Sequence, residues 1–155
     1  MKREALDLHE AKNPHCAQCR NKDERETDGG LCRIAPSVVD ELPARCVGSW
    51  ASDKIYFLTQ YLGIFGNGMK NRWDGKLDYF EICSGPGRCV IRESGREIDG
   101  TALAVVHNRH FCHYHSATFF DISEKVVDTL NRRFEPALRI ARRRRDCRSL
   151  RCGLQ

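Results

Sequence analysis

Residues 77–87 read LDYFEICSGPG, and this stretch decides the fold class. Its first seven residues are mostly apolar and include two aromatic side chains, a composition that favours a buried β-strand. Ser84-Gly85-Pro86-Gly87 follows at once and is typical of a tight turn. Because glycine has no side chain, such a turn lets the backbone approach a ligand closely. The stretch therefore predicts a strand that leads into a candidate nucleotide-binding turn.

The chain after this turn alternates between predicted strands and helices. Residues 88–99 are charged and contain a glycine, so we expect a loop there. Residues 101–109 predict a helix, and residues 115–122 predict a second strand. Ser123 opens another helix, which Pro136 is expected to end. This order predicts an α/β fold with parallel strands.

Residues 53–65, upstream of the strand, have apolar side chains at helical spacing. Ser52 can cap the first backbone N–H groups of this helix. Gly66-Asn67-Gly68 is expected to end it. We interpret the segment as a helix that packs on the core.

Four residues around the glycine turn are candidate ligands of a cofactor. Asp121 stands at the end of the second predicted strand, where an acid can accept hydrogen bonds from ribose hydroxyls. Glu81 lies just before the turn and can accept a hydrogen bond from an amine or a water, and Gly85 and Gly87 supply backbone. The turn lacks the third glycine of the dinucleotide fingerprint, and no helix begins directly after it, so a pyrophosphate is disfavoured. A ligand without phosphates, such as S-adenosylmethionine, is tolerated.

Two structural alternatives stay open at this point. The glycines can form a turn and nothing more, since single glycine turns are common. Asp121 can be an acid that caps the helix after it.

Three stretches, in this order and spacing, are more specific together than any one alone. They are WASDKIYFLTQYLGIF at 50–65, WDGKLDYFEICSGPG at 73–87, and the pair of segments 100–106 and 119–134. Residues 50 to about 135 thereby resemble the N-terminal part of the three-Cys-motif partner proteins, a bacterial family with a methyltransferase-like Rossmann domain. Glu81 stands where the family has an aspartate.

The resemblance implies a partial Rossmann-like, methyltransferase-type parallel sheet with flanking helices, preceded by a cysteine-bearing N-terminal segment. It implies S-adenosylmethionine as cofactor at Glu81, Gly85, Gly87 and Asp121. It also implies a protein partner that bears a three-cysteine motif. The alternative function is a non-catalytic, zinc-stabilised accessory or partner-binding protein.

The resemblance ends near Glu135, before the further strands that a Rossmann sheet normally has. We therefore expect a truncated domain, and whether it is an active enzyme is left open, with no catalytic residue identified. Residues 136–155 are arginine-rich and look like sequence from a shifted reading frame, so we expect a disordered tail. Arg142–Arg145 offer charge for nucleic-acid phosphates, but a solvated tail is favoured because no aromatic residues interleave for base stacking.

Cysteines in the N-terminal segment, residues 1–48, have a spacing that suits a metal ion. Cys16, Cys19, Cys32 and Cys46 give Cys-x2-Cys-x12-Cys-x13-Cys, which predicts a zinc knuckle. His9 or His15 can replace one cysteine, and buried cysteines without metal are the alternative. The later group Cys112-His113-Tyr114-His115 is interpreted as part of an exposed loop.

Composition sets the broad class. The 155 residues are 41% hydrophobic and 30% charged, a globular balance without a stretch long enough to span a membrane. Nine cysteines without a visible secretory signal favour a reducing, cytoplasmic location over a secreted disulfide scaffold. The net charge of +5 comes from the tail, so the body of the chain is not a basic nucleic-acid-binding surface.

Overall fold

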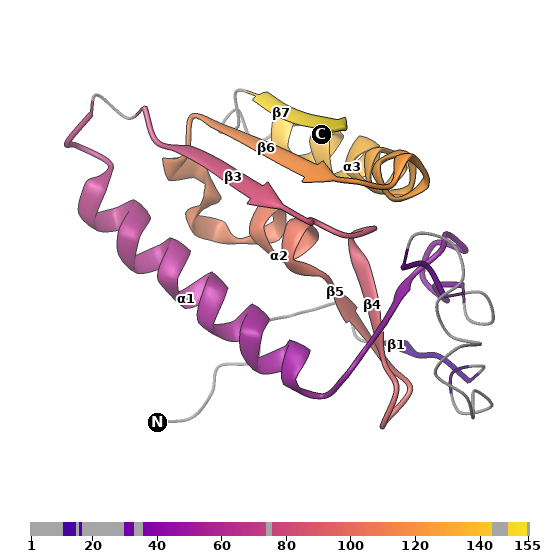
Figure 1. The fold of residues 1–155 in the computed structure, drawn as a ribbon. Helices are drawn as coiled ribbons and strands as arrows, with labels where there is room; N and C mark the ends of the chain where they lie inside the picture. The colour runs from indigo at the N-terminus through magenta and orange to yellow at the C-terminus, as the bar shows by residue number, and fades with distance from the viewer. Residues whose placement is uncertain are drawn as a thin grey trace.

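The computed structural model describes residues 11–14, 16, 30–32, 36–73, 76–143 and 149–154, with side chains described as far as residue 135. The fold is mixed α/β (Figure 1). Its elements in chain order are β1 (Ala11–Lys12), β2 (Arg45–Val47), α1 (Trp50–Met69), β3 (Asp78–Ile82), β4 (Arg88–Ile91), β5 (Arg96–Asp99), α2 (Thr101–His107), the 3-10 helix η2 (Arg109–His113), β6 (Ser116–Asp121), α3 (Glu124–Arg143) and β7 (Ser149–Leu154).

The strands form two separate sheets. One has the order β3-β6-β7, and both of its pairings are parallel, with Phe80 opposite Thr118 and Thr118 opposite Arg151. The other has the order β1-β5-β4-β2, in which β4 is antiparallel to β5 and parallel to β2. The predicted parallel pairing of the strand before the glycine turn with the strand near residue 120 is thus confirmed.

The main core lies on one face of the parallel sheet. Alternate residues of β6 are buried, and Ala117 and Phe119 pack in one cluster with Leu103 of α2 and Leu130 of α3. Side chains of β6 alternate between the two faces of the sheet, so both helices cover the face to which Phe119 belongs. From α1, Leu62 joins the same cluster.

The loop expected at residues 88–99 is instead the hairpin β4–β5. Its charged side chains suggested a solvated loop, but Arg88, Glu97 and Asp99 are all buried. They bond to one another, with Arg88 Nε 2.5 Å from Glu97 Oε1 and Arg88 Nη1 2.8 Å from Asp99 Oδ1. Charged side chains can be buried when they are paired with opposite charges. This pairing allows the charged sequence of residues 88–99 to form buried strands.

Both long helices extend beyond their predicted ends. Helix α1 begins at Trp50, before the expected cap Ser52, whose hydroxyl accepts a hydrogen bond from Arg96. It continues past Gly66, which packs closely against Tyr114, so a tertiary contact outweighs the local stop signal. Helix α3 continues through Pro136. Phe134 already anchors the helix in the core, and extending a formed helix costs less free energy than nucleating a new one.

Both ends of the chain join the fold where the structure describes them. The N-terminal segment supplies β1, which pairs with β5, and β2, which pairs with β4. The tail expected to be disordered continues α3 to Arg143 and adds β7 beside β6. Of the helices in the described ranges, none is long and apolar enough to cross a membrane.

Candidate functional site

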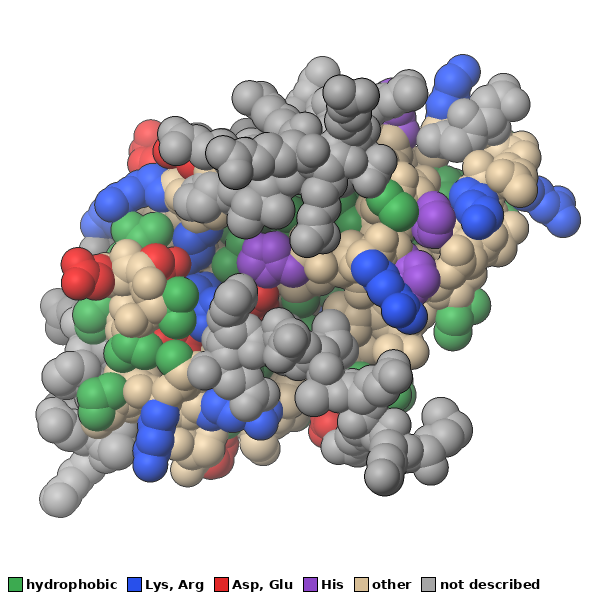
Figure 2. Space-filling model, turned by 180° about the vertical axis from the view of Figure 1, so that it is seen from behind, with side chains coloured by type: hydrophobic (Ala, Val, Ile, Leu, Met, Phe, Trp, Pro, Cys, Tyr) green, Lys and Arg blue, Asp and Glu red, His purple; other side chains and the backbone are tan. Residues whose placement is uncertain are grey.

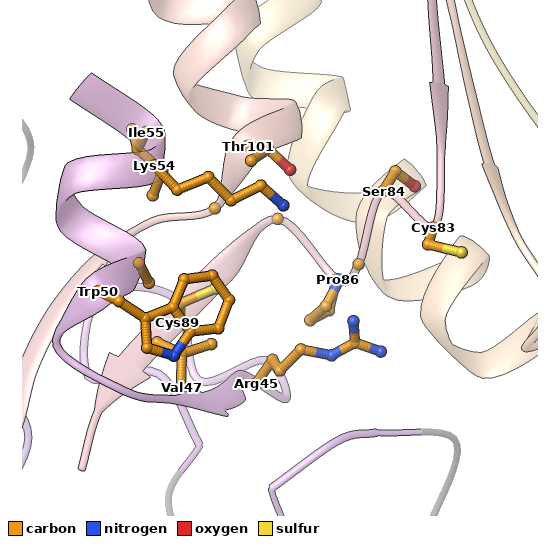
Figure 3. Close-up of a pocket in the computed structure, with 14 residues that line it drawn as sticks. Arg45, Val47, Trp50, Lys54, Ile55, Cys83, Ser84, Pro86, Cys89 and Thr101 are labelled. Carbon is orange, nitrogen blue, oxygen red and sulfur yellow. The ribbon is translucent and has the colours of Figure 1, made fainter. Parts of the chain in front are cut away.

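A pocket lies at the carboxyl end of β3, where the chain turns through Gly85 and Gly87 (Figure 3). Its volume is about 110 Å³, within a hollow of about 510 Å³ that includes open solvent. Helix α1, strand β2, the glycine turn and the start of α2 form its wall. The lining residues are Arg45, Val47, Trp50, Ala51, Lys54, Ile55, Cys83, Ser84, Gly85, Pro86, Gly87, Cys89, Gly100 and Thr101.

The turn requires its glycines for two different reasons. Gly85 and Gly87 have φ angles of 70° and 96°, which side chains of L-residues rarely allow. A Cβ on Gly87 would also lie 3.0 Å from Leu130 and 3.2 Å from Leu103, so this turn sits directly on both helices. Cys83 takes a φ of 62° without being glycine. The turn is therefore a tightly constrained, buried structure that forms part of the pocket wall.

Asp121 stabilises the turn from behind. Its Oδ2 accepts a hydrogen bond from the Gly85 N–H at 3.1 Å, and its Oδ1 accepts one from the Ser123 N–H at 3.2 Å. The side chain is buried and does not line the pocket. Asp121 therefore holds the glycine turn and the backbone just before α3, and its contact with a cofactor stays a prediction.

Glu81 also lies behind the pocket wall. Thr101, which does line the pocket, donates its hydroxyl hydrogen bond to Glu81 Oε1, and Tyr79 Oη donates to Oε2 at 3.2 Å. Burial raises the pKa of the Glu81 carboxyl, against the lowering effects of these two hydrogen bonds and of the Lys54 charge. Glu81 therefore positions Thr101 at the pocket wall.

Two cations and an aromatic ring at the pocket were not predicted as site residues. The Lys54 side chain extends from α1 toward the glycine turn, Arg45 runs beneath Pro86, and the Trp50 ring lies at the base of α1 (Figure 3). Positive charge at the pocket favours an anionic group such as a carboxylate. Trp50 and Lys54 lie in residues 50–65, one of the stretches on which the family resemblance rests, so the sequence offered a signal for them. No sequence signal pointed to Arg45.

Ser84 is a polar group in this wall whose hydrogen bonding is incomplete. The residue is 4% exposed, and its Oγ has no hydrogen-bond partner within the described part of the chain. Buried hydroxyls in proteins usually bond to protein, water or ligand. Ser84 is therefore a candidate to bond a molecule in the pocket.

The two cysteines near the turn differ in surroundings. Cys83 is exposed and lines the pocket. Cys89 is buried in the cluster of Ile55 and Ile98, and burial raises the pKa of its thiol to about 11. A protonated thiol is a poor nucleophile and a poor metal ligand, so Cys89 serves packing.

The predicted zinc ligands are described in part. Cys16 is buried beside Val90, Cys32 packs against the same cluster, and Cys46 lies opposite Val90 in the β2–β4 pair. Cys19 lies outside the described residues. Within the ranges that the structure describes, no three cysteine, histidine or acidic side chains are grouped so as to hold a metal ion. The zinc site thus stays a prediction.

The histidines after α2 form contacts with one another and with α1. The rings of His110 and His113 lie 5.9 Å apart, and His110 Nδ1 is 3.2 Å from Asn67 Nδ2. Cys112 Sγ lies 3.8 Å from His113 Nδ1. Figure 2 shows histidine side chains exposed on the back face. These contacts attach η2 to α1. Cys112 and His115 are exposed as expected, whereas Tyr114 between them is buried and Cys112 lies in a 3-10 helix rather than in a loop.

Comparisons with protein-family models, curated proteins and solved structures find no match for this chain. The resemblance to the three-Cys-motif partner proteins therefore stays a prediction. Function has to be argued from the pocket and its charges.

Proposed function

We propose that this pocket binds S-adenosylmethionine, or a closely related sulfonium nucleoside, in a methyltransferase-like Rossmann half. One observation carries the proposal. The glycine turn, Lys54 and Arg45 meet at the carboxyl end of a parallel strand, which is the edge where open α/β sheets bind their ligands.

The sheet topology supports the proposal. Strands β3, β6 and β7 lie side by side in their order along the chain, with α2 and α3 on one face and with β4 and β5 between β3 and β6 in sequence. One half of a doubly wound sheet also has parallel strands in sequence order with helices on one face, which supports the proposal. We infer that the parallel sheet is a Rossmann-like half and that the β4–β5 hairpin is an addition between its first strand and first helix.

The pocket's chemistry fits the amino-acid end of such a ligand. Lys54 and Arg45 attract its carboxylate, and the Trp50 ring attracts its positively charged sulfonium. A pocket of about 110 Å³ holds only this end, so the nucleoside lies in the solvent-open hollow. Glu81 and Asp121 act indirectly, by holding Thr101 and the turn. No residue is assigned to methyl transfer.

Calorimetric titration of the full chain with S-adenosylmethionine and S-adenosylhomocysteine tests the proposal. Lys54→Ala removes one charge-assisted hydrogen bond, so we expect about 10-fold weaker binding. Lys54 is exposed, and the fold should tolerate its loss. Lys70→Ala, also exposed and at the far end of α1, is the matched control and should bind like the original chain. Equal affinity in both variants, or no binding by folded protein, refutes the proposal.

A zinc-stabilised accessory protein is the second candidate function. The observation that favours it is the packing of Cys16 and Cys32 in the cluster of Val90, whose partner in the β2–β4 pair is Cys46. The partner would be the protein with a three-cysteine motif that the family resemblance implies. This function needs no ligand in the pocket, so folded protein that binds zinc and ignores S-adenosylmethionine would favour it.

A further inference from the structure

Helix α1 carries an apolar stripe on its outer face. Trp50, Phe57, Tyr61 and Ile64 are 60%, 68%, 60% and 75% exposed, and their spacing places them on one side of the helix. The outer face of a surface helix is normally polar. A continuous apolar strip of this kind marks a surface that another protein covers.

The stripe borders an open edge of the parallel sheet. Strand β3 pairs with β6 on one side, and no described strand pairs with its other side. Leu58 and Phe65 lie between the stripe and the core, and they pack against the cluster that holds Leu77 and Tyr79. Figure 1 shows α1 on the opposite side of β3 from β6. A strand added to this edge would therefore lie on the α1 side of β3.

We propose that a second copy of this chain occupies this surface. The two β3 strands pair antiparallel about a two-fold axis, and the two α1 stripes pack against each other beneath them. Each copy contributes one open edge, and the two-fold pairing uses both. The assembly is thus a closed dimer with one continuous six-stranded sheet.

The β3 sequence suits pairing with itself. With the axis at Phe80, Asp78 faces Ile82 of the second copy, and Tyr79 faces Glu81. No acid then faces an acid, so the like-charge repulsion that destabilises cross-strand pairs is absent.

The helix suits the same axis. When the stripes cross antiparallel about Phe57, Trp50 packs on Ile64 of the second copy. Lys54 and Asp53 flank the stripe on its two sides. In this arrangement Lys54 lies beside Gln60 and Asp53 beside Tyr61, so neither charge meets a like charge. The two-fold arrangement is therefore free of charge conflict along both elements.

The available area approaches what a stable dimer requires. The four stripe residues, about two-thirds exposed, offer on the order of 500 Å² per copy, against roughly 800 Å² per partner in a standard interface. Pairing of the β3 edge adds backbone hydrogen bonds and further area. The stripe and the edge together thus account for a stable interface.

Molar mass by light scattering, over a dilution series of the full chain, tests the dimer. We expect a dimer that Ile64→Glu converts to monomer, a two-fold fall in mass. Val39→Glu is the matched control, because Val39 is 50% exposed and lies before β2, outside both the stripe and β3. The control should keep the dimer mass. Circular dichroism of each variant reports whether the fold is kept.

Several results would overturn the proposal. These are a monomer at every concentration, an open-ended assembly, or a dimer that Ile64→Glu leaves intact. If Ile64→Glu does not fold, hydrogen exchange of the original chain decides, since β3 amides should exchange more slowly in concentrated than in dilute protein. Equal exchange rates refute the dimer, and a monomer that binds another protein through α1 assigns the surface to that partner. Ile64 does not line the pocket, but Trp50 and Lys54 belong to both surfaces. Ligand binding by Ile64→Glu is therefore measured beside its molar mass, so that failure of the dimer and failure of the pocket are told apart.

Discussion

Gly87 and Gly68 are in opposite surroundings. Gly87 has a φ of 96°, and a Cβ there would lie 3.0 Å from Leu130 and 3.1 Å from Arg133. Gly87→Ala therefore adds both backbone strain and a clash, and we expect a loss of about 2 kcal/mol or more in the free energy of unfolding. Urea titration measures it.

Gly68→Ala is the matched control for that substitution. Gly68 lies in α1 with nothing within 4 Å of its would-be Cβ. Alanine there restricts the unfolded chain without a clash, so we expect a gain of about 0.5–1 kcal/mol. If Gly87→Ala is as stable as Gly68→Ala, the glycine turn is not tightly constrained.

Arg133 is a single residue that ties the glycine turn to the N-terminal segment. Its guanidinium is buried, donates to the carbonyl oxygens of Pro86 and Pro43 at 2.6 and 2.7 Å, and pairs with Asp40 Oδ2 at 2.7 Å. Burial of Asp40 acts to raise its pKa, but the hydrogen bonds and charge of Arg133 outweigh it and hold the pKa below 3.8.

This pair predicts a pH dependence of stability. A carboxyl with a lowered pKa in the folded state stabilises the fold above its unfolded pKa, and this is lost as pH falls through the folded value. We expect Asp40→Asn to be less stable at neutral pH and to lose less stability than the original chain below about pH 4. Urea titrations across pH measure this, with the exposed Asp128→Asn as control. Identical acid profiles for the original chain and Asp40→Asn would contradict it.

The candidate site could be predicted from the sequence only in part. Gly85 and Gly87 were predictable because a glycine turn is set by local sequence, and both residues do line the pocket. Lys54 and Arg45 reach the pocket from α1 and β2, and their positions depend on packing between distant segments. Periodicity along a chain carries no information about such contacts, so these cations were missed.

The β4–β5 hairpin depends on a buried ionic group. Arg88 bonds to Glu97 and Asp99, and Glu97 also accepts hydrogen bonds from the Ser37 hydroxyl and, at 3.0 Å, from the Val38 N–H. Arg88→Met would leave two buried acids without their cation, so we expect a loss of about 3–5 kcal/mol in stability. Thermal and urea unfolding measure the change.

Arg92→Met is the matched control on the same hairpin. Arg92 pairs with Glu93 at 3.0 Å, but both side chains are largely exposed. An exposed pair contributes at most about 1 kcal/mol, so the variant should unfold nearly like the original chain. Similar small losses in both variants would mean that the buried group is not what holds the hairpin.

Elements with an apolar pattern were predictable, and those built from charge were not. Strands β3 and β6 have apolar side chains that alternate with polar ones or follow one another directly. The ends of both strands were predicted within one or two residues. Residues 88–99 look like a loop because the pairing of Arg88 with Glu97 is visible only in three dimensions. The ends of α1 were wrong because Gly66 serves close packing rather than helix termination.

At the scale of the molecule, the two sheets meet through the glycine turn. Strand β3 of the parallel sheet ends at this turn, and β4 of the mixed sheet begins directly after it. The mixed sheet also includes β1 and β2 from the cysteine-bearing N-terminal segment. Whatever stabilises that segment therefore also stabilises the wall of the pocket, since Arg45 and Val47 belong to β2.

Zinc binding is the prediction that belongs to this scale. Cys16 and Cys32 pack in the cluster of Val90 on β4, and Cys46 is the partner of Val90 in β2. A metal bound by cysteines of the N-terminal segment would therefore fasten this segment to the mixed sheet. We expect one zinc ion per chain in purified protein, and loss of the metal in the double variant Cys16→Ser, Cys32→Ser.

Thermal unfolding completes the test. Structural zinc adds its binding free energy to folding, so a chelator should lower the unfolding temperature of the original chain and leave the double variant unchanged. Cys112→Ser is the control, because Cys112 is exposed on η2, away from β2. It should keep both the zinc and the chelator response. Folded protein that contains no zinc would show that these cysteines pack without a metal, and the pocket wall would then depend on Arg133 and the hairpin alone.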